Sequence, residues 1–310
     1  MSVKKVINGM GFLEIIFLGT GGSLPTKKRN LPSIVVRRGA EIIMFDCGEG
    51  TQKQLIHAKI GINKKMKILI THMHGDHVLG LPGLFQSMSL LGRDKKIELY
   101  GPKGIIDFIE SIERTVKYGR TFELEIFEVS EDEVIDDQEY KILSTNTDHG
   151  ILCLAYSIEE KDKPGRFNPI KAKDLGIPKG PLWKKLQLGN NIKIKGNVVR
   201  SSEVLGPKRP GSKIVYATDT KPCESVTNLA KNADVLIHDS TFDEDRKEKA
   251  EEYGHSTASQ AANVAKKSNA TKLVLIHISA IYEDAENLLK QALKIHKKTI
   301  LAHDLMKIKV

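Results

Sequence analysis

The chain has 310 residues, of which 40% are hydrophobic and 28% are charged, as is typical of a soluble globular protein. Its 48 Lys and Arg residues outnumber its 39 Asp and Glu residues, for a net charge of +9. This excess favours a polyanionic partner such as nucleic acid or an anionic membrane surface, although a solvated lysine-rich surface explains it equally well. Three isolated cysteines exclude a disulfide framework. Because no signal-peptide pattern or bilayer-spanning stretch is found, we expect a cytoplasmic protein with no membrane partner.

Apolar runs predict strands, and apolar residues at helical spacing predict helices, in alternation along the chain. In the first part we expect strands at residues 12–22, 33–39, 40–50, 65–72 and 95–102. Helices are expected there at residues 51–60, 78–92 and 104–118. In the second part the expected strands are 121–130, 140–150, 151–159, 213–220, 233–242 and 272–279. The expected helices are 256–268 and 285–296.

A β-rich stretch followed by helices therefore occurs twice, and this repetition predicts two similar halves. Two such halves form an α+β fold, a four-layer αβ/βα sandwich, with the polar ends of its strands gathered at one edge. We expect residues 1–310 to form a single domain of this kind.

Residues 161–200 break the pattern. This segment carries four prolines and many glycines and lysines, and its apolar residues show no period. We interpret it as a flexible, protruding basic arm inserted into the domain. A charged loop without function is the alternative.

The sequence ITHMHGDHVLG places three histidines and an aspartate directly after a buried strand. These residues are His72, His74, Asp76 and His77, in the pattern H-x-H-x-D-H. In a loop, alternate residues can converge on one point. Imidazole and carboxylate groups suit zinc and similar ions, so the cluster predicts a metal site rather than a set of structural histidines.

Further candidate ligands follow other apolar runs, namely His149, Asp219 and His277. The combined set is too large for one zinc ion and suits two. His72, His74 and His149 could hold the first ion, and Asp76, His77 and His277 the second. Asp219 could bridge them through its two oxygens. Two ions about 3.5–4 Å apart can polarise a phosphoryl group and lower the pKa of a bound water.

These motifs resemble the metallo-β-lactamase fold superfamily and, within it, the ribonuclease Z family. The resemblance covers essentially the whole chain. It rests on FLGTGGSLPTKKRN, FDCGEGTQ, THMHGDHVLGLPG, KPGRFNP…GIPKGPLWKKLQLG, YATDT, LIHDSTF, GHSTA and HISAIY. It implies a zinc-dependent endoribonuclease that removes the 3′ trailer of precursor tRNA after the discriminator base. The products would be a tRNA 3′-hydroxyl and a trailer 5′-phosphate. Two Zn²⁺ ions per subunit, or Mn²⁺ or another divalent ion, and a homodimer are also implied.

The resemblance also implies catalytic roles. Asp76 would act as general base on the water between the metals. His255, oriented by Asp239, would protonate the departing 3′ oxygen, as that step of the hydrolysis requires. Without the family, His255 could equally be a residue at the N-terminus of a helix, before Ser256.

Two basic segments resemble the family's RNA-binding parts. The arm resembles the exosite that holds the tRNA elbow, and its lysines and arginines can neutralise phosphates. The PTKKRN loop resembles one that senses the RNA 3′ end, although by itself it could be a plain basic turn. The RNA-binding candidates are Lys27, Lys28, Arg29, Asn30, Arg166, Lys179, Gly180, Pro181, Lys184 and Lys185.

The chain also departs from the family. Asp239 stands where the family commonly has glutamate, and this shorter side chain leaves open a looser contact with His255. Ile281 and Ser157 occupy positions where the family has arginine. The alternatives are a small-molecule hydrolase of the same fold, which would need no basic arm, and a non-catalytic RNA-binding protein, which should have lost metal ligands.

Overall fold

The computed structural model describes residues 13–194 and 196–310. Phe12, where we expected the first strand to begin, lies outside them, as do the other residues before Leu13. Two compact units are present. The larger contains the described parts of Met1–Asp136, Ile142–Ile158 and Lys213–Val310, and the smaller contains Asp137–Lys141 and Glu159–Ser212.

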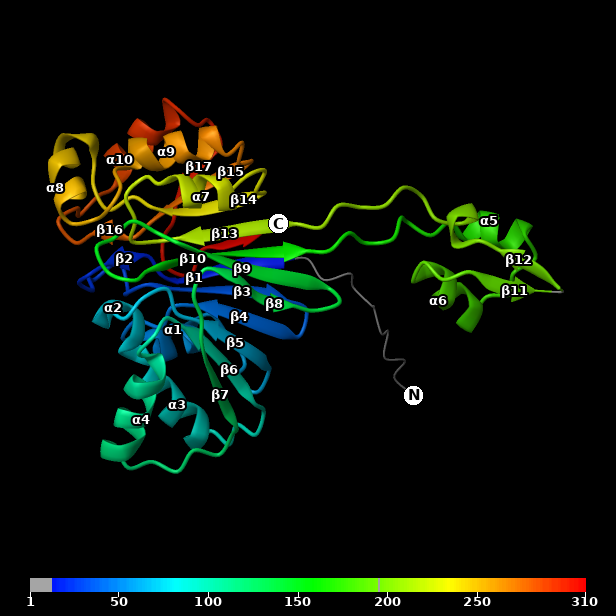
Figure 1. Ribbon diagram of the computed structural model, residues 1–310, viewed down its shortest axis with the longest axis horizontal. Helices are drawn as coiled ribbons and strands as arrows, with labels where there is room; N and C mark the ends of the chain where they lie inside the picture. Colours follow the sequence, from blue (N-terminus) through cyan, green and yellow to red (C-terminus); the bar gives the residue numbers. More distant parts are fainter. Residues whose placement is uncertain (1–12, 195) are drawn as a thin grey trace. The chain divides into compact units, whose positions relative to one another are not determined.

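Two seven-stranded sheets form the frame of the larger unit (Figure 1). The first has the strand order β18 (Lys307–Lys309), β1 (Leu13–Gly19), β3 (Ser33–Arg38), β4 (Glu41–Phe45), β5 (Lys65–Leu69), β6 (Ile97–Gly101) and β7 (Leu124–Glu128). The second has the order β17 (Thr299–Leu301), β15 (Lys272–Ile276), β14 (Val235–Asp239), β13 (Lys213–Ala217), β10 (Leu154–Glu160), β9 (Tyr140–Asn146) and β8 (Asp132–Asp136).

Helices cover the outer face of each sheet. The first sheet packs against α1 (Thr51–His57), α3 (Gly80–Leu90) and α4 (Ile105–Thr115), which together enclose one apolar core. The second packs against α7 (Glu224–Leu229), α9 (Ala258–Lys267) and α10 (Glu286–Leu293), around another. Burying an apolar stripe of each helix on an apolar sheet face produces these layers. The expected four-layer α+β sandwich is therefore confirmed.

Aromatic side chains join the inner faces of the two sheets. The ring of Phe45 on β4 lies 5.1 Å from that of Tyr216 on β13 and 6.1 Å from that of Tyr156 on β10. The hydroxyl of Tyr156 donates to the carbonyl of Ile70 at 2.8 Å, beyond the end of β5. These contacts tie β4 and β5 of the first sheet to β10 and β13 of the second.

Parallel pairing brings the carboxyl ends of several strands to one edge. Strands β4, β5 and β6 run parallel in the first sheet, and β13, β14 and β15 run parallel in the second. Most residues of these strands are buried, and the strands of the second sheet are nearly continuous apolar runs, as a strand covered on both faces requires. The candidate ligands His72, Asp219 and His277 follow β5, β13 and β15.

The smaller unit has its own secondary structure. It contains α5 (Pro169–Asp174), α6 (Pro181–Gln187) and a hairpin of β11 (Ile192–Ile194) and β12 (Asn197–Val199). A small apolar cluster holds these elements together, formed by Ala172, Ile177, Leu186, Ile192, Val199 and Val204. The sequence showed no apolar period here because helices of six or seven residues are too short to display one.

Gly180 begins α6 with φ of 151° and ψ of −146°, a conformation that a side chain would strain. Pro181 then occupies the first helical position, where it costs no hydrogen bond.

Among the described residues of the whole chain, no helix has both the length and the apolar character needed to cross a bilayer.

Candidate metal centre and active site

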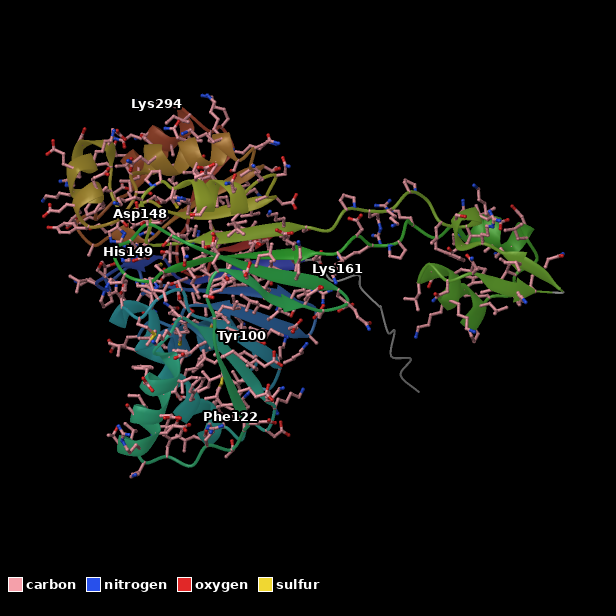
Figure 2. The ribbon with its side chains drawn as sticks, in the orientation of Figure 1. Tyr100, Phe122, Asp148, His149, Lys161 and Lys294 are labelled. Carbon is pink, nitrogen blue, oxygen red and sulfur yellow. The ribbon has the colours of Figure 1, made fainter. Side chains whose placement is uncertain are left out.

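The residues of the candidate metal centre come from loops at the shared strand edge. His72 and His74 follow β5, while Asp76 and His77 lie in the short helix α2 (Gly75–Val78). His149 lies in the loop between β9 and β10, next to Asp148 (Figure 2). Asp219 follows β13, and His277 lies between β15 and the two-residue strand β16 (Ile278–Ser279).

Two of these residues have an unusual backbone. Asp219 and His277 have φ angles of 48° and 58°, in the left-handed region that residues other than glycine rarely adopt. Such conformations persist only where the surrounding structure enforces them, and they are concentrated at functional sites.

The structure brings all the predicted ligands together in two groups, and a third, overlapping group joins Asp219 and His277 with His255. The first contains His72, His74, His149 and Asp219, and the second contains Asp76, His77 and His277; within each group the candidate ligand atoms lie within 4.8 Å of one another. Asp219 lies between the groups. Its Oδ2 is 3.7 Å from His72 Nε2, and its Oδ1 is 3.3 Å from His277 Nε2.

Hydrogen bonds at the opposite ring nitrogen fix the histidines of the first group. The Thr71 hydroxyl donates to the Asp46 carboxylate at 3.0 Å, so it must accept a proton from His72 Nδ1, 2.9 Å away. His149 Nδ1 lies 2.9 Å from the carbonyl oxygen of Gly254 and donates to it. Each ring therefore carries its proton on Nδ1 and directs the lone pair of Nε2 into the cluster.

Hydrogen bonds at Nδ1 also fix the histidines of the second group. His77 Nδ1 lies 2.9 Å from Asp46 Oδ2, and a carboxylate can only accept. The Thr241 hydroxyl donates to Asp239 at 2.7 Å and accepts from His277 Nδ1 at 2.9 Å. Both Nε2 atoms are buried and have no hydrogen-bond partner among the described residues. Buried acceptors without partners are costly, so these residues fit a bound cation.

The ligand atoms of the first group also fit a bound cation. His74 Nδ1 lies 3.0 Å from His72 Nε2 and 3.3 Å from His149 Nε2. The Nε2 atoms of His72 and His149 both carry lone pairs, and the single proton that His74 Nδ1 could donate cannot fully satisfy both. A divalent ion with nitrogen and oxygen ligands at about 2.0–2.2 Å would satisfy them.

His255 and Asp239 form a dyad beside the two groups. Asp239, at the end of β14, is fully buried, and its Oδ2 accepts from His255 Nδ1 at 2.8 Å. The shorter aspartate therefore reaches the histidine directly. Burial lowers the pKa of His255, but the charge of Asp239 outweighs it and raises that pKa to about 9. The ring is thus protonated at neutral pH, as a general acid must be.

Asp76 is held in its ionised form. Burial opposes ionisation, but the imidazole rings of His277 and His77 beside it lower the pKa of its carboxyl well below the ordinary value. The backbone N–H of Ser23 also donates to its Oδ2 at 2.9 Å. Oδ1 makes no hydrogen bond with any described residue, which leaves one oxygen to accept a proton.

The PTKKRN loop divides into two kinds of residue. Lys27 and Lys28 are exposed, whereas Arg29 and Asn30 are partly buried. The Arg29 guanidinium donates to the Thr20 hydroxyl and the Ala302 carbonyl, each at 2.7 Å. The predicted RNA-binding role of Arg29 and Asn30 therefore competes with an anchoring role. The two lysine side chains are exposed, although that of Lys28 donates to the Glu283 carbonyl at 3.3 Å.

Asp304 completes this anchor. Its Oδ1 accepts from Thr20 Oγ1 at 2.7 Å, and its Oδ2 accepts from the Asn30 backbone N–H at 2.7 Å.

In the smaller unit the other RNA-binding candidates are all exposed, and they are Arg166, Lys179, Gly180, Pro181, Lys184 and Lys185.

This division predicts different stabilities for two charge deletions in one loop. Arg29→Ala is expected to lower the free energy of unfolding by about 1–3 kcal/mol, because it leaves buried partners unsatisfied. Lys27→Ala is expected to change it by less than about 0.5 kcal/mol. Urea unfolding of both variants measures the difference, and equal effects would contradict the anchoring role.

The groups that orient the ligands were not predicted from the sequence. They are Asp46, Thr71, Thr241 and the carbonyl of Gly254. Only Asp46 had a recognisable signal, because it too follows a buried strand at the same edge.

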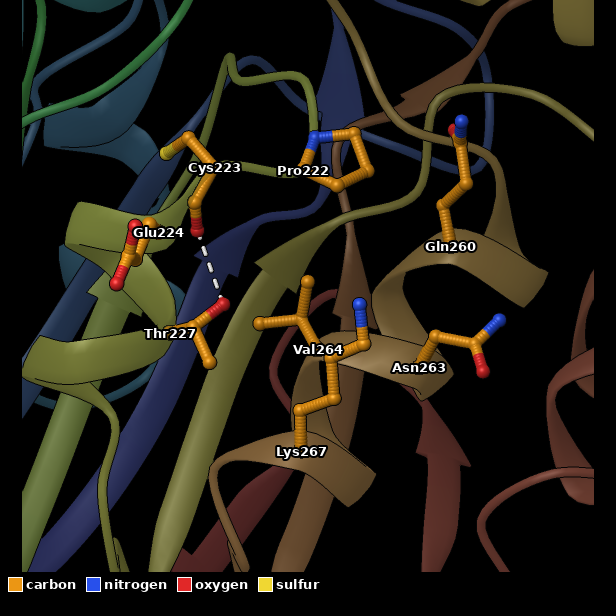
Figure 3. A pocket seen from close by; sticks show the side chains of 8 residues that line it. All are labelled: Pro222, Cys223, Glu224, Thr227, Gln260, Asn263, Val264 and Lys267. Atoms are coloured by element: carbon orange, nitrogen blue, oxygen red, sulfur yellow. Dashed lines mark hydrogen bonds between the residues drawn. The ribbon is translucent and has the colours of Figure 1, made fainter.

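The metal cluster opens into a pocket of about 390 Å³, lined also by His255. A larger pocket of about 560 Å³ lies between α7 and α9 and is lined by Cys223, Gln260 and Lys267, among others (Figure 3). Its lining offers no converging ligands, so chemistry rather than size identifies the smaller pocket as the active site.

Comparison with known proteins supports this class of site. A family model described as "Anti-Pycsar protein Apyc1" matches residues 13–149, and one described as "Beta-lactamase superfamily domain" matches residues 200–278. A metallo-β-lactamase fold protein, YhfI from Bacillus subtilis, superposes with a TM-score of 0.70 at 18% identity, over 97% of this chain and all of its own. Fold and site thus define a metal-dependent hydrolase of the metallo-β-lactamase fold.

More similar relatives narrow the class. The chain is 44% identical to ribonuclease Z of Methanosarcina acetivorans, over 96% of this chain and 98% of that protein. It is 42% identical to ribonuclease Z of Nitrosopumilus maritimus, over 96% of this chain and all of that one. The short form of human tRNase Z is 28% identical, with a TM-score of 0.68, over 95% of this chain and 98% of its own. The chain belongs to the ribonuclease Z family, and the predicted resemblance is confirmed.

Proposed function

We propose that this endoribonuclease removes the 3′ trailer of precursor tRNA by hydrolysis after the discriminator base. The products are a tRNA 3′-hydroxyl and a trailer 5′-phosphate. The names of the relatives support RNA, and specifically tRNA, as the substrate. The observation that carries the proposal is the placement of two ligand groups around Asp219, with the His255–Asp239 dyad in the same pocket.

We infer that the cluster holds two Zn²⁺ ions, with Mn²⁺ or another divalent ion as alternatives. His72, His74 and His149 would hold one ion, and Asp76, His77 and His277 the other. Asp219 would contact both, since one of its oxygens faces each group. Such a pair of ions polarises a phosphoryl group and lowers the pKa of a water molecule.

The protein's own residues would then move the protons. Asp76 accepts the proton of the attacking water at its Oδ1. His255 donates a proton from Nε2 to the departing 3′ oxygen, because its Nδ1 is occupied by Asp239. The buried carboxylate of Asp239 keeps the ring oriented and stabilises its charged form.

We further propose that the inserted basic arm, residues 161–200 within the smaller unit, binds the tRNA elbow. Lys27 and Lys28 would contact the RNA near the cleaved bond. The exposure of the arm's lysines supports this. By the family resemblance, we also propose that the protein is a homodimer. All three cysteines are free, which is compatible with a cytoplasmic location.

The direct test is incubation with a 3′-extended precursor tRNA, followed by mapping of both product ends. We expect a single cut after the discriminator base, with a 3′-hydroxyl upstream. Cleavage at scattered positions, or cleavage only of small phosphodiesters, would contradict the proposal.

The fold of the arm suggests a clean deletion. Lys163 and Arg209 exchange backbone hydrogen bonds of 2.9 Å in both directions, so residues 164–208 can be replaced by a two-residue hairpin turn. We expect kcat/KM for precursor tRNA to fall by at least about tenfold, because phosphate contacts are lost. Cleavage of bis-p-nitrophenyl phosphate should be retained, and equal loss on both substrates would indicate disturbed folding instead.

A charge-matched pair of variants separates the arm's charge from its fold. The triple alanine variant of Lys179, Lys184 and Lys185 should weaken tRNA cleavage and flatten its dependence on salt. The control replaces three exposed lysines of the larger unit, Lys294, Lys297 and Lys298. Equal effects of the two triple variants would show that only net charge matters.

A further inference from the structure

The rim of the active-site pocket is apolar. Besides the ligands and the dyad, its lining includes Leu24, Tyr253 and Ile281, whose exposed fractions are 65%, 55% and 57%. Among the described residues that line this pocket there is no lysine or arginine. The walls beyond the metal cluster therefore offer dispersion and stacking contacts rather than charge for a phosphate.

Tyr253 is held in place by its chain neighbours. It ends α8 (Lys247–Glu252), and the next residue, Gly254, has φ of +73°. The carbonyl of Gly254 accepts from the ring of His149, and a Cβ at Gly254 would lie 2.8 Å from the His149 carbonyl oxygen. The backbone N–H of His255 is bonded to Ala250 at 2.8 Å. The backbone on both sides of Gly254 is thus fixed against two active-site histidines.

The side chain of Tyr253, in contrast, has no partner. Its hydroxyl makes no hydrogen bond, and its ring makes no aromatic or cation–π contact, with any residue that the structure describes. An exposed aromatic ring on a fixed backbone loses little entropy when it binds a ligand.

We propose that Tyr253, together with Leu24 and Ile281, forms a subsite for a nucleobase of the RNA. This inference rests on the proposed function, which puts RNA in the pocket. Every base has a flat π face that stacks on an aromatic side chain. The phosphates, in contrast, would find no cationic side chain on this rim.

The proposed mechanism favours one of the two bases. His255, which lies two residues after Tyr253 and lines the same pocket, would give its proton to the 3′ oxygen of the nucleotide upstream of the cut. We therefore assign the base of that nucleotide, rather than the downstream base, to Tyr253.

The test combines protein variants with abasic RNA. Tyr253→Leu removes the ring but keeps an apolar side chain, and should lower kcat/KM for precursor tRNA by about 5- to 150-fold, the usual effect of one stacked base. Tyr253→Phe should restore most of the activity because it keeps the ring. Glu252→Ala, an exposed neighbour outside the pocket, is the control and should stay within about twofold.

The same measurements use precursor tRNA with an abasic ribose on either side of the cut. With the upstream base removed, the wild type should lose activity. On this RNA, Tyr253→Leu should then be no less active than the wild type. An equal loss for Tyr253→Leu on intact and upstream-abasic RNA, no loss on either, or coupling to the downstream base would overturn the subsite. Failure of the wild type to cut intact precursor tRNA would instead refute the proposed function.

Discussion

Asp76→Ala is expected to lower kcat for precursor tRNA by at least about 10³-fold, because it removes both a ligand of the second group and the proposed general base. Asp76 Oδ2 lies 3.4 Å from His77 Nε2 and 3.6 Å from His277 Nε2. Asp219 Oδ1 lies 3.5 Å and 3.3 Å from the same two nitrogens, but Asp219 is the residue proposed to contact both ions. Single-turnover cleavage with saturating enzyme measures the loss without a contribution from binding.

Asp148→Ala is the matched control. Asp148 is an exposed carboxylate next to His149, paired with Lys221 at 3.2 Å, and it belongs to neither ligand group. Its removal should change kcat by less than about twofold. Turnover of precursor tRNA by Asp76→Ala at a near-normal rate would sink the mechanism.

His255→Ala should have the second largest effect, and its size should depend on the leaving group. A ribose 3′ oxygen must be protonated as it departs, so RNA cleavage should slow by about 10²–10⁴-fold. Nitrophenolate departs without a proton, so bis-p-nitrophenyl phosphate should lose far less. Parallel rate measurements on both substrates give the ratio.

Asp239→Asn provides the companion variant. It keeps the shape of the side chain but removes the charge that favours the protonated ring of His255. It should reproduce the same dependence on the leaving group in weaker form. If His255→Ala slowed both substrates equally, His255 would be a structural residue and not the general acid.

Several candidate ligands could be recognised in the sequence because they follow buried apolar strands. Parallel strands carry such residues to one edge, so His72, Asp219 and His277 could be grouped without coordinates. The α+β sandwich followed from the repeated order of strands and helices in the same way.

The orienting contacts could not be predicted, because they join residues far apart in the chain. Thr20 meets Asp304 across 284 positions, and Tyr216 meets Asp46 across 170. Hydrogen bonds to a carbonyl, such as that of Gly254 with His149, carry no sequence signal at all. The division of the PTKKRN loop into anchoring Arg29 and exposed Lys27 likewise depends on the packing of the C-terminal segment.

The fold of the arm could not be predicted from the sequence for a different reason. Its core is formed by a few apolar residues spread over short elements, such as Ala172 on α5 and Leu186 on α6. Pattern analysis needs longer helices or strands, so the segment resembled a structureless loop.

In the proposed mechanism, two ions held around Asp219 would drive RNA hydrolysis. The most direct measurement is titration of the metal-free enzyme with Zn²⁺, following both cleavage of a 3′-extended precursor tRNA and bound zinc per chain. Two ions per chain at full activity, with the cut after the discriminator base, is the predicted result. Full activity with one ion, or with none, would contradict it.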